Sequence, residues 1–255
     1  MVLSLLLACA DPEAMPIEEM EAAIAALGQT APPTATLCLN GALLRSQGGN
    51  PDFSRICMRL PGLIPDCDDE TCHPTFGVLD VKQALDALLQ ELDSNSDGIV
   101  DEGDEERRVQ LAGYSWGRGS AFLLAFDGDP RFEELRVHRL LGINPYRDGW
   151  HESLEPSVHV DEAVSYRNSK APDGDCSSSS PKGPYFGLPL DCSAEQECLD
   201  IDVSSDPDAV WTADSAFEFD HLVPEYTGAE LGHCSTVIGV STRFIEHGWG
   251  LPLQE

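Results

Sequence analysis

A serine stands between two glycines in the middle of the chain, in the pattern Gly113-x-Ser115-x-Gly117. The short, mostly apolar run 109–112 precedes this pattern, and small and apolar residues follow it. A buried strand that turns sharply into a helix has no room for a β-carbon at either glycine, and the strained turn points the serine outward. The pattern therefore predicts a nucleophile elbow at Ser115. The alternative is an ordinary glycine-rich turn with a solvated serine.

A serine hydroxyl becomes a nucleophile only beside a base, so the histidines later in the chain are candidates for that role. His233 follows a candidate last strand over 217–223 and precedes an apolar helix expected over 236–246. His247 is the second candidate. We predict His233 as the general base. The alternatives are that His233 only caps a helix and that His247 lies on the surface.

The elbow and the histidine, in this order along the chain, resemble the lipase-like α/β-hydrolases. Some of these enzymes place the aspartate of the catalytic triad in an Asp-Pro step just after the strand that follows the elbow. The matching step here is Asn144-Pro145, so the resemblance implies that Asn144 orients the ring of His233. An amide can orient an imidazole but cannot balance its positive charge. Asp148, a few residues further on, is the alternative source of a carboxylate.

The same resemblance implies an oxyanion hole, which acyl transfer needs to stabilise the tetrahedral intermediate. One donor is the backbone N–H of Trp116, the residue after the nucleophile. The other lies in the loop after the first strand, around Gly41-Ala42, and we assign it to Ala42. The resemblance covers about residues 34–145 and 217–247.

An acidic loop over residues 93–104 stands between an expected helix and the strand that leads to Ser115. Its order, D-x-[DN]-x-[DN]-G, resembles EF-hand loops and, more closely, their dockerin variant. The resemblance implies a structural Ca²⁺, held by the side chains of Asp93, Asn95, Asp97, Asp101 and Asp104 and the carbonyl of Ile99. Asp104 replaces the usual glutamate, and a second loop is missing. The alternative is an acidic turn that binds nothing specific.

The chain has nine cysteines, and no two of them have the C-x-x-C spacing of a metal site. Disulfide bonds are therefore the better explanation, and they indicate a location outside the cytoplasm. Cys67 with Cys72, and Cys192 with Cys198, are spaced to close short loops, although the sequence leaves the connectivity open.

The residues Leu5-Leu6-Leu7-Ala8-Cys9 resemble the lipobox of a bacterial lipoprotein. The resemblance implies a lipid anchor through Cys9 and leaves eight cysteines to pair. A plain secretory remnant is the other interpretation. We therefore expect an extracytoplasmic protein, either a lipoprotein of the bacterial cell envelope or a secreted protein.

The net charge of −30, from 45 acidic and 15 basic residues, excludes nucleic acid and anionic membranes as partners. The expected partner is instead a small-molecule or lipid ester, the substrate of the candidate serine.

Apolar runs that alternate with a helical pattern predict an α/β fold, with a mainly parallel sheet and helices on both faces. Strands are expected over 34–39, 56–60, 109–112, 137–143 and 217–223. The clearest helix covers 81–92, with Asp80 as N-cap and Gln83 placed to close a capping box.

Three parts of the chain differ in composition. Residues 1–33 are expected to be an export-signal remnant and an acidic tether, and residues 34–255 form the hydrolase-like domain. Within this domain, residues 150–216 are rich in Pro, Gly and Ser, and predict a disulfide-tied, lid-like insertion.

These features together predict an exported serine hydrolase of the esterase or lipase type with a structural calcium. The alternative is a non-catalytic, calcium-binding surface lipoprotein that retains the hydrolase fold. Asn144 in place of an aspartate favours the alternative, whereas the intact elbow and the well-placed His233 favour the enzyme.

Overall fold

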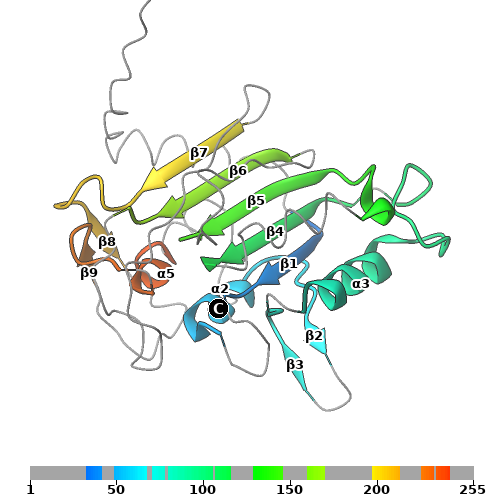
Figure 1. Ribbon diagram of the computed structural model, residues 1–255, viewed down its shortest axis with the longest axis horizontal. Coiled ribbons are helices and arrows are strands. Elements are labelled where there is room, and N and C mark those ends of the chain that lie inside the picture. The colour runs from blue at the N-terminus through cyan, green and yellow to red at the C-terminus, as the bar shows by residue number, and fades with distance from the viewer. Residues whose placement is uncertain are drawn as a thin grey trace, which may run out of the picture.

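The computed structural model in Figure 1 describes residues 33–41, 49–67, 71–77, 80–105, 107–115, 129–145, 160–169, 197–212, 225–232 and 234–241. Its centre is a five-stranded sheet in the order β1-β4-β5-β6-β7, and every neighbouring pair is parallel. The strands are β1 (Ala35–Leu39), β4 (Val109–Tyr114), β5 (Val137–Ile143), β6 (Val160–Arg167) and β7 (Glu197–Asp202). A parallel sheet combined with helices confirms the α/β class.

The remaining described elements are short. The helices are α2 (Pro51–Cys57), α3 (Val81–Leu92) and α5 (Ser235–Gly239), and Pro130–Phe132 form the 3₁₀ turn η4. Two antiparallel hairpins lie outside the main sheet, β2 (Asp66–Cys67) with β3 (Cys72–His73) and β8 (Val210–Thr212) with β9 (Glu225–Thr227). None of the described helices has the length and apolar composition that crossing a lipid bilayer requires.

Apolar side chains pack on both faces of the sheet. On one face, α2 and α5 cover the strands, and the buried cluster includes Phe53, Ile56, Ala112, Leu141, Val237 and Ile238. On the other face, α3 covers them, with Leu37, Leu85, Leu88, Leu111 and Leu140. Because β1, β4 and β5 are buried along their whole length, their sequences are mostly apolar and do not alternate between apolar and polar residues. Such runs correctly predicted β1, β4 and β5, and the apolar face of residues 81–92 correctly predicted α3.

The strand expected over residues 56–60 is wrong, because helix α2 occupies residues 51–57. Asn50 caps this helix through its side-chain oxygen, which accepts hydrogen bonds from the N–H groups of Asp52 and Phe53. Pro51 occupies the first turn, where it costs no hydrogen bond. The capping residues therefore determine this segment, and its apolar residues bury one helical face.

The capping box at the start of α3 is also wrong. Asp80 stands at the N-cap position but makes no side-chain cap hydrogen bond. Gln83 instead donates from its Nε2 to Oδ1 of Asp66, at 2.8 Å, and so links α3 to the β2–β3 hairpin.

The lid-like insertion expected over 150–216 is wrong for two of its segments, because β6 and β7 are strands of the main sheet. Charged residues interrupt the apolar pattern of both segments, so the sequence did not predict these strands. Glu162 in β6 is buried and accepts a hydrogen bond from Arg139 of β5. Asp200 and Asp202 in β7 pair with Arg167 of β6. Ion pairs between neighbouring strands thus let acidic residues occupy the sheet.

Several sequence predictions fall outside the described residues. They are the strand over 217–223, the helix that follows the elbow, the end of the helix over 236–246, and residues 1–32 with Cys9. The start of the closing helix is confirmed to within one residue, because α5 begins at Ser235.

Candidate active site

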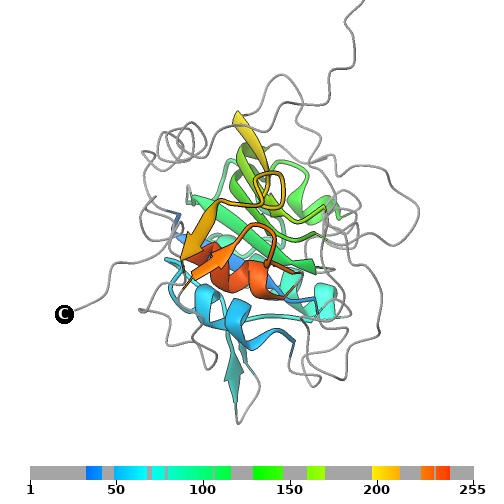
Figure 2. The same ribbon diagram turned by 90° about the vertical axis from the view of Figure 1, so that its left-hand side faces the viewer.

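All five strands of the sheet end at the same edge. In Figure 1 their arrowheads point toward α5 and the β8–β9 hairpin, and Figure 2 views this edge end-on. Parallel α/β sheets bind ligands beyond the carboxyl ends of their strands, where loops from several strands meet. Ser115, Asn40, Asn144 and Asn168 each directly follow one of these strands.

Ser115 follows β4 in a backbone conformation that L-residues rarely adopt. Its φ is +53°, in the left-handed region. A non-glycine residue in this region costs free energy, and such strain is concentrated at functional sites. The positive φ is what a sharp turn after a buried strand requires, and it is the main structural feature in favour of a nucleophile elbow at Ser115.

The backbone at Gly41 lies directly against Ser115. A β-carbon built on Gly41 would stand 2.6 Å from Cβ of Ser115, 3.2 Å from its Oγ and 3.2 Å from the carbonyl oxygen of Tyr114. The pairing of Leu39 with Gly113 in the sheet register brings the two turns together. Gly41 is therefore required by a close approach of two main chains, and its backbone lies beside the Ser115 hydroxyl.

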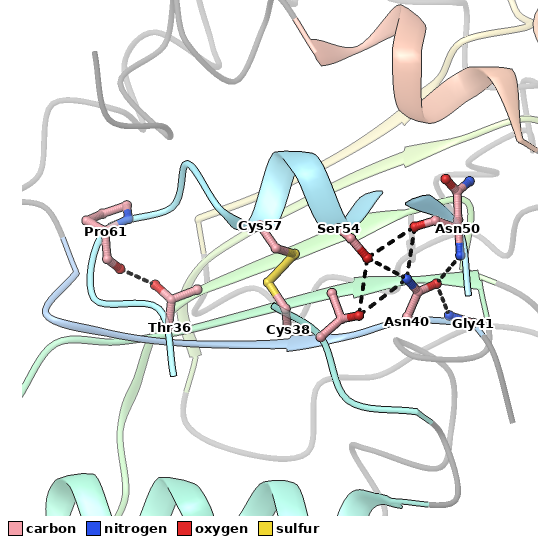
Figure 3. Close-up of a disulfide and its surroundings, with 9 residues drawn as sticks. Thr36, Cys38, Asn40, Gly41, Asn50, Ser54, Cys57 and Pro61 are labelled. Atoms are coloured by element: carbon pink, nitrogen blue, oxygen red, sulfur yellow. Dashed lines mark hydrogen bonds between the residues drawn. A yellow bond between two sulfur atoms is a disulfide. The ribbon is translucent and has the colours of Figure 1, made fainter. Parts of the chain in front are cut away.

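Asn40, one residue earlier, is buried and holds the beginning of this loop (Figure 3). Its Oδ1 accepts hydrogen bonds from the backbone N–H groups of Gly41 and Asn50, at 2.8 and 2.9 Å. The sequence places Gly41 in the loop after the first strand but does not indicate a role for Asn40. The side chain of Asn40 contacts α2, which the sequence did not predict, so its partners were not visible.

Asn144 follows β5, is fully buried and has a φ of +44°. Its Oδ1 accepts a hydrogen bond from the backbone N–H of Asn168, at 2.7 Å. Its Nδ2 donates to Oγ1 of Thr236 at 3.2 Å and contacts the carbonyl oxygen of Gly232 at 3.5 Å. Asn144 therefore binds the chain on both sides of position 233.

The segment 231–236 is further held by its own hydrogen bonds and by Asn168. The buried Asn168 donates from its Nδ2 to the carbonyl oxygen of Leu231. Oγ1 of Thr236 donates to the carbonyl oxygen of Gly232 at 2.6 Å, and the N–H of Gly232 donates to Oγ of Ser235 at 2.7 Å. The role of Asn168 is not visible in the sequence, because its contact with Leu231 joins residues 63 positions apart.

A contact between Tyr114 and Cys234 connects the two halves of the candidate site. The Tyr114 hydroxyl donates to Sγ of Cys234 at 3.3 Å, and Cys234 is itself disulfide-bonded. Tyr114 precedes Ser115, and Cys234 follows His233. The structure thus brings together the Ser115 turn, Asn144 and the residues on both sides of His233. The side chains of His233, His247, Trp116, Ala42 and Asp148 lie outside the described residues.

Asp202 is a carboxylate at the carboxyl end of β7 in the described sheet. It accepts hydrogen bonds from the N–H of Ser169 and from the N–H and Oγ of Ser204, at 3.2, 3.1 and 2.6 Å. Burial raises the pKa of Asp202, but hydrogen bonds from Ser169 and Ser204 and the charge of Arg167 outweigh it and hold the pKa below its ordinary value. Asp202 is therefore engaged in structural contacts.

The acidic loop 93–104 closes on itself through side-chain oxygens. Asp93 accepts hydrogen bonds from the N–H groups of Asp97 and Gly98, at 3.1 and 2.8 Å. Oδ1 of Asp104 accepts from the N–H groups of Ser94 and Asn95, at 2.7 and 3.3 Å, and joins the end of the loop to its beginning. Gly98 has a φ of +91°, as the sharp bend requires.

The loop is also attached to the rest of the chain. The N–H of Val100 donates to the carbonyl oxygen of Arg131 at 2.8 Å. The Arg131 guanidinium pairs with Asp129 and with Asp86 of α3, both at 2.6 Å. The oxygen donors are of the type that Ca²⁺ prefers. Within the described part of the chain, however, no three His, Cys, Asp or Glu side chains converge on a point that a metal ion could occupy.

Two disulfide bonds join described residues, Cys38–Cys57 and Cys67–Cys72. The second confirms the short loop predicted from spacing. The first connects β1 to α2 beside the Asn40 contacts (Figure 3). The side chains of Cys192 and Cys198 lie outside the described residues, so their pairing stays a prediction. The chain matches no protein-family model, no curated protein and no solved structure.

Proposed function

We propose that the protein is an exported serine hydrolase of the carboxylic ester type, an esterase or lipase, with Ser115 as its nucleophile. The observation that carries the proposal is the positive φ of Ser115 at the carboxyl end of β4, with the Gly41 backbone against its hydroxyl. A strained serine beside the main chain of a second loop is the arrangement that acyl transfer uses.

In this proposal, Oγ of Ser115 attacks the ester carbonyl, and His233 takes the serine proton and returns it to the leaving alcohol. Water then attacks the acyl-enzyme with the same base and releases the acid. The N–H groups of Trp116 and Ala42 stabilise the oxyanion. The contact of Tyr114 with Cys234 supports a short distance between the Ser115 turn and the segment that carries His233.

The role of Asn144 in this mechanism is to hold the histidine segment. Its amide binds Gly232 and Thr236, on either side of position 233. A neutral amide does not stabilise the imidazolium that forms during attack, so we expect slower turnover than a carboxylate would support. If Asp148 supplies the carboxylate instead, Asp148→Asn lowers turnover by a large factor, and turnover in that variant separates the two assignments.

The test of the proposed function is labelling with a fluorophosphonate probe, which reacts with activated serines. We expect the wild type and Ser205→Ala, a matched variant at an exposed serine, to be labelled and to hydrolyse p-nitrophenyl esters. Ser115→Ala abolishes both activities. A wild type that is neither labelled nor active on short and long acyl esters contradicts the proposal.

The second candidate function is a non-catalytic, calcium-binding surface lipoprotein. The observation in its favour is that asparagines, Asn144 and Asn168, follow the two strands after the elbow strand. Both amides are engaged in holding the segment 231–236. An unlabelled wild type that still binds calcium would support this candidate.

We also propose that loop 93–104 binds a structural Ca²⁺ through the ligands predicted from the sequence. The support is the order of its oxygen donors, its closure through Asp104, and its place between α3 and β4. Bound calcium would brace the strand that leads to Ser115, because this loop joins α3 to β4.

The calcium proposal is tested by thermal melting with calcium and with a chelator. A ligand that binds only the folded state raises its stability by mass action. We expect calcium to raise the melting temperature of the wild type, and of a control in which two exposed carboxylates outside the loop, Glu133 and Glu134, are replaced by alanine. Asp93→Ala combined with Asp97→Ala removes the effect. Identical wild-type curves with calcium and with chelator contradict the proposal.

The proposed location is outside the cytoplasm, with a lipid anchor at Cys9 or as a secreted protein. The disulfides Cys38–Cys57 and Cys67–Cys72 support it, because such bonds persist in oxidising compartments. Mass spectrometry after alkylation without reductant should find the eight cysteines other than Cys9 mostly paired. Mostly free thiols would remove this support.

A further inference from the structure

The side chain of Asn40 holds both ends of the loop that follows β1. Its Oδ1 accepts hydrogen bonds from the N–H of Gly41, where the loop begins, and from the N–H of Asn50, where it ends. Gly49 packs against the same amide, since a β-carbon on Gly49 would stand 2.5 Å from Cγ of Asn40. One buried oxygen therefore sets the position of two backbone segments.

The amide nitrogen of Asn40 fixes the direction of this oxygen. It donates to the carbonyl oxygen of Asn50 at 3.0 Å and contacts Oγ of Ser54 and Oγ1 of Thr75, at 3.3 and 3.5 Å (Figure 3). Asn50 and Ser54 belong to the cap and first turn of α2. The amide cannot rotate without losing these contacts, and Asn40 is only 2% exposed.

Asn40 is itself held in place by bonds within β1 and to neighbouring segments. Two residues before it, Cys38 is joined to Cys57 of α2 by a disulfide bond. The backbone N–H of Asn40 donates to the carbonyl oxygen of Phe76 at 2.9 Å. The hydrogen bonds of the Asn40 side chain therefore join an anchored part, β1 and α2, to the backbone of Gly41.

We propose that Asn40 is a positioning residue for the nucleophile, which fixes the Gly41 backbone against Ser115. This inference rests on the proposed function and extends it to a residue that touches no substrate. A main chain beside a reacting group must be held closely, because a displacement of about 1 Å costs about 100-fold in rate. An amide suits the role, because one of its atoms accepts from two N–H groups while the other donates to a carbonyl.

The test compares Asn40→Ala with Thr36→Val. Thr36 is buried in the same strand, and its Oγ1 donates to the carbonyl oxygen of Pro61 at 2.6 Å. Both variants lose buried side-chain hydrogen bonds, but only Asn40 binds Gly41. We expect Asn40→Ala to slow fluorophosphonate labelling of Ser115 and kcat by about 100-fold, with KM within about threefold. Thr36→Val lowers the melting temperature and leaves labelling within about twofold of wild type.

Asn40→Asp supplies a second readout, through its pH profile. A protonated carboxyl group has the shape of the amide, with a donor and an acceptor, whereas the ionised group loses the donor and meets the Asn50 carbonyl oxygen. We therefore expect the labelling rate of Asn40→Asp, divided by that of the wild type, to rise at least fivefold from pH 8 to pH 5.5, about the size of a recovered hydrogen bond.

The outcomes separate this inference from the proposed function. If the wild type is labelled and Asn40→Ala is labelled at the same rate, the positioning role of Asn40 is overturned and the proposed function is not. The same holds if Thr36→Val slows labelling as much as Asn40→Ala does. A constant Asn40→Asp ratio across pH also overturns the positioning role. An unlabelled wild type overturns the proposed function, and with it the catalytic meaning of the Asn40 contacts.

Discussion

The two ends of β4 are built in opposite ways. At its amino end, the acidic loop 93–104 is mostly exposed, and its side-chain hydrogen bonds join residues 2 to 11 positions apart. At its carboxyl end, the Ser115 turn lies at the edge of the sheet where buried asparagines follow neighbouring strands, and side-chain contacts of Asn144 and Asn168 join residues 24 to 92 positions apart. The loop folds through local contacts, whereas the candidate active site exists only when the sheet has formed.

The two ends of β4 also differ in charge: the accessible loop carries carboxylates, and the buried strand ends carry neutral amides. The carboxylates in the loop are partly or fully accessible to water, and carboxylate oxygens are ligands that Ca²⁺ prefers. At the strand ends, an ionised group would lose its water and face backbone carbonyl oxygens. Asparagine provides hydrogen bonds at these positions without a charge, which explains why Asn40, Asn144 and Asn168 occupy the buried edge.

The largest effect is expected from placing a charge at the buried end. Asn144→Asp puts a carboxylate against the carbonyl oxygen of Gly232, where the amide now donates. We expect a loss of about 4 kcal/mol in the free energy of unfolding, the cost of an uncompensated buried charge. Denaturant melts should show Asp97→Asn, the opposite exchange in the exposed loop, within about 0.5 kcal/mol of wild type without calcium. Equal losses would break the comparison.

A smaller loss of stability is expected when the buried disulfide is removed. Replacing Cys38 and Cys57 by alanine opens a link across 19 residues, at a cost of about 3 kcal/mol. The link between Cys67 and Cys72 spans only 5 residues, so its removal should cost about 2 kcal/mol. The first pair of replacements should also slow Ser115 labelling, because α2 carries the partners of Asn40. If the variant without Cys38–Cys57 is labelled as fast as the variant without Cys67–Cys72, the expected connection between α2 and Ser115 reactivity is contradicted.

The difference between the two ends also determined what the sequence could predict. The strands β1, β4 and β5 and the helix α3 were readable, because their apolar residues follow one simple pattern. The strands β6 and β7 were not, because Glu162 and Asp202 are neutralised by arginines on neighbouring strands. No local pattern marks a charge whose partner lies in another element.

The candidate site was predictable in the same uneven way. The elbow pattern around Ser115 and the order of the acidic loop are local, and both were found from the sequence alone. The role of Asn40 depends on a helix that replaced an expected strand, and Asn168 meets Leu231 only in the folded chain. Contacts of this kind require the fold before they can be recognised.

Two glycine substitutions, one beside each end of β4, compare the two regions by the labelling rate of Ser115. In Gly41→Ala, the new β-carbon meets Cβ of Ser115 at 2.6 Å and the carbonyl oxygen of Tyr114 at 3.2 Å, and neither atom is the far end of a flexible side chain. We expect Ser115 labelling to fall about 100-fold, about 2.7 kcal/mol in the barrier. In Gly103→Ala, the new β-carbon meets Oδ1 of Asp101 at 2.9 Å, which is the far end of a half-buried side chain that can shift. Labelling in that variant should stay within about twofold of wild type.

The smallest effect concerns acid stability. Two carboxyl groups with a lowered pKa are compared, Asp104 in the acidic loop before β4 and Asp202 at the carboxyl end of β7. Burial raises the pKa of Asp202, and hydrogen bonds from Ser169 and Ser204 with the charge of Arg167 lower it further than burial raises it. Desolvation likewise raises the pKa of Asp104, and hydrogen bonds from the N–H groups of Asp101, Ser94 and Asn95 outweigh it.

A carboxyl group whose folded pKa is depressed stabilises the fold above its ordinary pKa of 3.8, and this contribution is lost as the pH falls through the folded pKa. Because Asp104 is exposed, solvent screens its contribution, whereas Asp202 is partly buried beside Arg167. Melting temperatures between pH 5 and pH 2, without calcium, should therefore fall less steeply in Asp202→Asn than in wild type. Asp104→Asn should follow the wild-type slope. A flatter slope in Asp104→Asn than in Asp202→Asn would show that the exposed loop, and not the buried strand edge, sets the acid stability of the fold.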